Sequence, residues 1–147
     1  MSLMEWLLLM NKIKKHAILA LIGGIIYGAL ELLFRGHTHW TMIVLGGVCF
    51  VTVGLINELI PWEMPLVVQM LCGAIIITAL EFGCGCIVNI WLGLNVWDYS
   101  KLWGNFLGQI CPLFSTIWYF ISLIAIVLDD HLRFWLFGEE MPHYKIF

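Results

Sequence analysis

Four long stretches of apolar residues divide the chain, at positions 17–34, 41–60, 66–92 and 106–128. A helix rises about 1.5 Å per residue, so each stretch is long enough to cross a hydrocarbon core of about 30 Å. The third stretch has residues to spare for a tilt. The pattern predicts an all-α membrane protein whose four transmembrane helices form a single integral membrane domain over residues 1–147.

Composition supports placing these helices in lipid. Hydrophobic residues make up 62% of the chain and charged residues 12%, against roughly 45–50% and about 25% in soluble domains. A soluble domain of this length has too little interior to bury so much apolar surface. We therefore expect a multi-pass protein of the cell membrane, with the lipid bilayer as its surroundings. The sequence has no stripe of basic residues of the kind that binds nucleic acid, so we expect no nucleic-acid partner.

Both ends of the chain have apolar segments outside the four stretches. Residues 6–10 lie early enough for a signal peptide, but the lysines follow this run and no small-residue cleavage pattern is present. We expect residues 1–10 to form a short interfacial helix instead, and residues 129–137 a second interfacial segment that ends at Gly138. The positive-inside rule predicts cytoplasmic termini, because that side collects Lys12, Lys14, Lys15, Arg133 and Lys145, and the other side only Arg35 and Lys101.

Two glutamates end nearly the same phrase in the first and third stretches, GGIIYGALE at 23–31 and GAIIITALE at 73–81, with six of nine positions identical. A charged side chain in a bilayer costs about 2.5–3.5 kcal/mol on insertion scales. A weaker internal similarity relates LGGVC at 45–49 to LGQIC at 107–111. The two similarities predict a parallel repeat of a two-helix unit, with its symmetry axis along the membrane normal.

Helical spacing places both glutamates on faces of small residues. Gly24, Gly28, Glu31 and Arg35 share one face of the first helix, and the third helix repeats this with Ala74, Thr78, Glu81 and Gly85. Small residues at this spacing let helices pack closely in lipid. Both carboxylates should therefore face other helices.

The two carboxylates differ in their local partners. Glu31 precedes Arg35 by one turn, which favours an ion pair, whereas Glu81 has no cation within a turn. In the structural interpretation Arg35 simply neutralises Glu31, and Glu81 is protonated through desolvation and holds helices together as a hydrogen-bond donor. In the functional interpretation the intramembrane glutamate binds a substrate. Glu81 is the stronger functional candidate.

Polar residues gather on the side opposite the predicted cytoplasmic face. With Glu31 and Glu81, they are expected to rim a cavity open to that side. His37 and His39 are weak candidates for a metal site, and the sequence otherwise predicts no metal or cofactor. The cysteines fall inside the spans, where small buried thiols are the better interpretation. Substrate-binding candidates are Glu31, Arg35, Glu81, Asp98, Tyr99 and Asn105.

The absence of known motifs narrows the function. The chain has no phosphate-binding loop, so it does not itself hydrolyse nucleotides, and it has neither metalloprotease nor serine-hydrolase signatures. Whether it is an enzyme stays open. Pro112 is expected to kink the fourth helix near Gly108.

Several longer phrases resemble a known family. They are LEF at 80–82, WDYS at 97–100, NFLGQIC at 105–111 with Ser115, RGHTHWTM at 35–42, INE at 56–58 and WLFGEE at 135–140. The chain is similar to the ABC-transporter permeases called ABC transporter type IV, a group that includes animal transmembrane protein 229, and resembles a compact version found in Firmicutes. The resemblance covers nearly the whole chain.

The resemblance implies transport, and three hypotheses remain. The first is a permease-like subunit that forms a homo-oligomer or joins a separate ATPase and handles a small solute or lipid. The second is a membrane-embedded binding protein or enzyme acting on a lipid or lipid-linked substrate at the outer leaflet. There Glu81 would be the base or cation-binding group, Asp98 its partner and Arg35 a phosphate contact. The third is a structural or accessory membrane protein.

Overall fold

A computed structural model describes residues 2–147, and in this range it contains helices and no strand. The elements are α1 (Leu3–Arg35), α2 (Trp40–Gly54), α3 (Ile56–Leu59), α4 (Leu66–Gly85), the π-helix η1 (Cys86–Trp91) and α5 (Pro112–Phe137). Four helical segments of this range are long and apolar enough to span a membrane, which confirms the predicted fold class.

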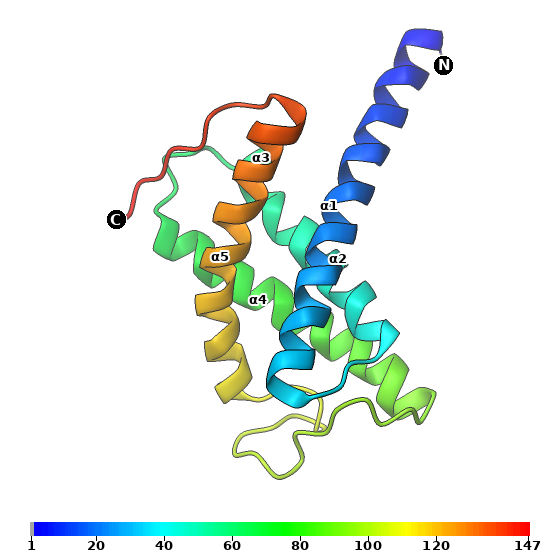
Figure 1. Cartoon of the computed structure of the whole chain (residues 1–147). Coiled ribbons are helices and arrows are strands. Elements are labelled where there is room, and N and C mark those ends of the chain that lie inside the picture. Colours follow the sequence, from blue (N-terminus) through cyan, green and yellow to red (C-terminus); the bar gives the residue numbers. More distant parts are fainter. Residues whose placement is uncertain (1) are drawn as a thin grey trace.

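The two ends of the bundle differ (Figure 1). One end, called here the loop end, carries the 36–39 turn and the 92–111 segment. The other, the terminal end, carries α3, the start of α1 and the carboxyl-terminal tail. Helix α1 packs mainly against α2, and α4 packs mainly against α5, whereas α1 and α5 make only slight contact with each other.

The amino end differs from the expectation of a separate interfacial helix. Helix α1 is continuous from Leu3 and begins with a capping box, in which Ser2 and Glu5 each accept from the other's backbone N–H. No glycine or proline between residues 10 and 17 interrupts it. The helix ends at Gly36, whose φ of 73° is the left-handed conformation that glycine adopts easily.

The fourth span is also shifted from its predicted bounds of 106–128. Pro112 is the first residue of α5, where its missing N–H costs nothing, so the predicted kink is wrong. Residues 106–111 instead form turns, with Leu107 and Gly108 both at positive φ. At its other end α5 continues through 129–137 to Gly138, so this segment is the end of the span and not a separate interfacial element.

Small residues allow the close helix packing that the sequence predicts. A side-chain carbon added at Gly24 would lie 2.5 Å from the Ile43 carbonyl oxygen of α2. One added at Gly73 would lie 2.5 Å from Ser122 Oγ of α5. Both glutamates lie on these packed faces, since Glu31 and Glu81 are buried. The symmetry relation between the two halves stays a prediction.

Candidate functional site

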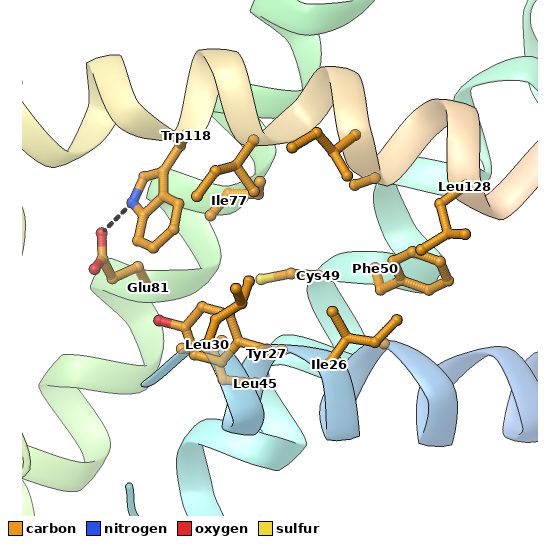
Figure 2. A pocket seen from close by; sticks show the side chains of 15 residues that line it. Ile26, Tyr27, Leu30, Leu45, Cys49, Phe50, Ile77, Glu81, Trp118 and Leu128 are labelled. Atoms are coloured by element: carbon orange, nitrogen blue, oxygen red, sulfur yellow. Dashed lines mark hydrogen bonds between the residues drawn. The ribbon is translucent and has the colours of Figure 1, made fainter. Parts of the chain in front are cut away.

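An apolar pocket lies in the middle of the bundle, between α1, α2, α4 and α5 (Figure 2). Its volume is about 110 Å³, close to that of an engineered cavity of roughly 150 Å³ that binds benzene. Among the residues that the structure describes, Glu81 is the one charged residue of its lining. The other lining residues are Gly23, Ile26, Tyr27, Leu30, Leu45, Gly46, Cys49, Phe50, Ile77, Trp118, Ile121, Ile124, Ala125 and Leu128.

The pocket reaches the surface of the bundle between α1 and α5. Ile26 and Leu30 on α1 are 39% and 36% exposed, and Ile124 on α5 is 65% exposed. These residues lie within spans that are apolar enough for a bilayer, so this surface faces lipid tails. In the part of the chain that the structure describes, α1 and α5 make only slight contact with each other beside this opening.

Glu81 is held by two neutral donors. Its side chain is 2% exposed. The indole Nε1 of Trp118 donates to Glu81 Oε2 at 2.9 Å, and the hydroxyl of Tyr99 donates to Glu81 Oε1 at 2.9 Å. Among residues 2–147 no basic side chain forms an ion pair with it. The carboxyl group is therefore oriented by hydrogen bonds from two neutral groups.

Tyr99 reaches Glu81 from the segment between η1 and α5. The Tyr99 ring stacks on Phe114 with ring centres 4.4 Å apart, and its N–H donates to the Gly108 carbonyl. Burial first, and then the nearby Glu81 carboxylate, raises the pKa of Tyr99 above its usual value of 10.0. The phenol therefore stays a neutral donor at physiological pH.

A buried amide fixes the path of this segment. Gln109 accepts from Asn89 Nδ2 through Oε1 at 2.8 Å, and its carbonyl accepts from Trp97 Nε1 at 3.0 Å. Trp97 therefore points inward, and Asp98, the next residue, is exposed. Tyr99, the residue after Asp98, is again partly buried. Gly85 makes room for Gln109, since an added side-chain carbon there would lie 2.5 Å from Gln109 Oε1.

Asp98 does not partner Glu81, so that part of the second hypothesis is wrong. Its carboxylate accepts from Ser100 N at 2.8 Å and from Ser100 Oγ at 2.9 Å, and these bonds lower the pKa of Asp98. Asn105 also stabilises the loop: Nδ2 donates to the Leu102 carbonyl and Oδ1 accepts from Gly108 N. Neither residue lines the pocket.

Glu31 also lies outside the pocket, so a cavity shared by the two glutamates is not what the structure contains. Arg35 Nη1 donates to Glu31 Oε1 at 2.7 Å, which confirms the predicted ion pair, and Thr38 Oγ1 donates to Glu31 Oε2 at 2.8 Å. Arg35 Nη2 also donates to the Val96 carbonyl at 2.9 Å. These hydrogen bonds connect the 36–39 turn, through Glu31 and Arg35, to the 92–111 segment.

The other sequence candidates have local roles. The His39 ring is the N-cap of α2 and lies 2.8 Å from Thr41 Oγ1, and His37 Nδ1 lies 3.0 Å from the Arg35 carbonyl. Within residues 2–147 no three His, Cys, Asp or Glu side chains are grouped to hold a metal ion. The five cysteines, Cys84 and Cys86 included, are free thiols.

Sequence reasoning missed a charged cluster at the terminal end. Arg133 Nε donates to Asp129 Oδ2 at 2.5 Å, and both side chains are almost fully buried. Glu58 lies 3.5 Å from Arg133 and 3.5 Å from Lys15, which also pairs with Glu139. The spacing of Asp129 and Arg133, one turn apart on α5, was the available signal. The cluster joins α1, α3, α5 and the tail.

Comparison with known proteins gives a family. A family model described as Putative ABC-transporter type IV matches residues 3–135. Neither the curated proteins nor the solved structures yielded a match. The matched region includes all four membrane-length helices except the last residues of α5, and it contains the pocket, Glu81, Tyr99 and Trp118.

Proposed function

Because the chain belongs to the ABC-transporter type IV family, we propose that it is a permease-like membrane subunit that takes up the hydrocarbon part of an amphiphilic substrate from the bilayer. The substrate enters sideways between α1 and α5. Its hydrocarbon part occupies the apolar pocket that ends at Glu81.

One observation carries this proposal: the pocket is apolar along its length and its open side faces lipid tails. Lipid already surrounds the opening, so a hydrocarbon chain that enters the pocket exchanges one apolar environment for another. No polar group of the hydrocarbon chain has to be desolvated. The volume of about 110 Å³ holds only part of a long chain. The remainder would lie along the exposed surfaces of α1 and α5.

Transport would need further components. The chain has no phosphate-binding loop, so any energy from ATP would come from a separate ATPase subunit. A homo-oligomer is the second arrangement that would enlarge the four-helix unit. Both kinds of partner belong to the proposal and are suggested by the family, whereas the pocket bears only on uptake of the substrate.

A structural role for Glu81 is the second candidate. Its two hydrogen bonds connect α4 with α5 and with the 92–111 segment. In this reading the carboxylate only fixes the bundle, and the pocket is a packing defect. If Glu81 is only structural and the pocket is a packing defect, filling the pocket should stabilise the protein and leave probe binding unchanged.

A pocket-filling substitution separates the two candidates. Ala125→Phe places a ring in the pocket, whereas Ala29→Phe adds the same ring on the exposed surface of α1 and serves as the matched control. Each purified variant is titrated with a fluorescent alkyl probe in lipid nanodiscs, and retained lipid is measured by native mass spectrometry. The proposal predicts that Ala125→Phe loses probe binding and Ala29→Phe keeps it. Equal binding by both variants would reject the pocket as the binding site.

A further inference from the structure

A second pocket, called here the polar pocket, lies at the terminal end of the bundle, where α3, α5 and the carboxyl-terminal tail meet. Its volume is about 320 Å³, in the range of small-molecule sites, and it shares no lining residue with the apolar pocket. Four lining residues are carboxylic acids, and three are not. They are Glu58, Asp130, Glu139 and Glu140, with Asn57, Trp62 and Arg133.

Negative charge is in excess in this lining, and much of it is accessible. The side chains of Glu58, Glu139 and Glu140 are 35%, 27% and 68% exposed. Within residues 2–147 the lining has one basic residue, Arg133. Lys15 of α1 lies beside the pocket and pairs with Glu58 and Glu139. Carboxylates still outnumber these two bases, so the polar pocket attracts cations.

Arg133 has donors to spare on the side of the polar pocket. Its Nε donates to Asp129, which is outside the lining, whereas Nη1 lies toward Glu58 and Glu139, which belong to it. The side chain is 2% exposed, yet neither Nη1 nor Nη2 has a hydrogen-bond acceptor among residues 2–147. The distances from Nη1 to Glu58 and Glu139 are 3.5 and 4.0 Å, longer than ordinary hydrogen bonds. A buried donor without an acceptor is costly, so a ligand oxygen would be stabilised here.

Asn57 leaves a group of opposite polarity in the same pocket. Its Nδ2 donates to Asp130 Oδ2 at 2.7 Å, which fixes the orientation of the amide. Its buried Oδ1 has no donor in the part of the chain that the structure describes. A positively charged N–H donor would suit this oxygen and the neighbouring carboxylates alike.

From these groups we propose that the polar pocket binds a small organic ammonium ion that carries a neutral oxygen acceptor beside its charge, such as an amino acid amide. The ammonium group lies among the accessible carboxylates and Asn57 Oδ1, and the oxygen accepts from the Nη atoms of Arg133. Trp62 lines the same pocket, and an indole ring attracts cations. The site lies apart from the apolar pocket and does not rest on the function proposed above.

Three matched probes test this site in the wild-type chain. L-Alaninamide carries both groups, ethylamine lacks the carbonyl, and propanamide lacks the ammonium. Each is titrated into protein in phosphatidylcholine nanodiscs at about pH 6.5, below the usual α-amino pKa of about 7.7–8.0. Saturation-transfer NMR, with empty nanodiscs as background, measures the affinities. We expect alaninamide to bind roughly tenfold more tightly than either other probe, because each of the two removed groups contributes about that factor.

Two isosteric variants test the location of the cation. Glu140→Gln removes the most exposed lining carboxylate, whose one ion-pair contact within residues 2–147 is with His143 at 3.9 Å, so the fold should be kept. It should weaken alaninamide binding about two- to fivefold and leave propanamide binding unchanged. Glu63→Gln is the matched control, since Glu63 is exposed in the loop after α3 and does not line the pocket. It should leave both affinities unchanged, and thermal unfolding reports that each variant is folded.

The outcomes are distinct. Equal affinity of the wild-type chain for all three probes, or no binding of any probe, would overturn the proposal. Alaninamide binding no tighter than ethylamine would overturn recognition of the oxygen by Arg133. An equal loss in Glu140→Gln and Glu63→Gln would overturn the placement of the cation in this pocket. None of these results bears on the apolar pocket, so failure here is separate from failure of the proposed function.

Discussion

Removing the guanidinium of Arg133 should destabilise the protein more than a typical substitution, although Arg133 lies far from the pocket end marked by Glu81. The Arg133 and Asp129 side chains are 2% and 0% exposed and share a bond of 2.5 Å. Arg133→Met keeps much of the apolar stem but leaves the Asp129 carboxylate buried without its cation. The Asp129 carboxylate packs directly against Gly54, where an added side-chain carbon would collide with it.

The expected loss follows from this burial. Breaking a buried pair by removing one partner costs about 3–5 kcal/mol, whereas replacing both partners by apolar groups is often neutral or stabilising. Glu58, at 3.5 Å from Arg133 Nη1, loses its contact too, but it is partly exposed and contributes less. We expect Arg133→Met to lose about 3 kcal/mol. The double variant Asp129→Leu/Arg133→Met should recover most of that loss.

Reversible unfolding by sodium dodecyl sulfate in mixed micelles, followed by tryptophan fluorescence, measures these free energies. Lys12→Met, on the exposed surface of α1, is the control for loss of a positive charge. A loss of under about 1 kcal/mol for Arg133→Met, the range of exposed pairs, would refute the reasoning. So would a double variant less stable than the single one.

Three further predictions concern packing and the 92–111 segment. Gly24→Ala should lower the unfolding free energy by about 1–3 kcal/mol in the same assay, because the new carbon meets the Ile43 carbonyl; no change would contradict the close α1–α2 approach. Asn105→Ala should speed proteolysis of residues 92–111, because Gly108 N loses its acceptor; an unchanged cleavage rate would count against that role. The lowered pKa of Asp98 means that its bonds from Ser100 N and Oγ stabilise the segment above the usual value of 3.8 and are lost as pH falls through the lowered pKa. Hydrogen exchange at the Ser100 amide, corrected for intrinsic rates, should stay protected at pH 3.8, and loss of protection at or above that pH would contradict the assignment.

Hydropathy and residue spacing were enough to predict the helices and their buried faces. The apolar stretches fix how many spans exist, since lipid admits little besides helices. The spacing of Gly24, Gly28 and Glu31 predicts a packed face, and the one-turn spacing of Glu31 and Arg35 predicts their ion pair. Each of these predictions depends only on residues within one helix.

The errors concern features that depend on distant contacts or on helix ends. The 106–128 stretch is apolar throughout, so hydropathy does not reveal that residues 106–111 turn and that Pro112 starts α5. Tyr99, and not Asp98, reaches Glu81 because Gln109 and Asn89 set the path of the segment. That network joins residues up to 20 positions apart, and no local pattern encodes it.

Photocrosslinking tests the central claim, the lipid-accessible pocket between α1 and α5, most directly. A phospholipid with a diazirine at the end of one acyl chain is incorporated into nanodiscs with the wild-type chain and irradiated, and labelled residues are mapped by peptide mass spectrometry. The pocket predicts labels on inward lining residues such as Cys49 and Ala125, in addition to lipid-facing Ile124, and loss of the inward labels in Ala125→Phe. Labels confined to outward-facing side chains, with none on Cys49 or Ala125, would contradict it.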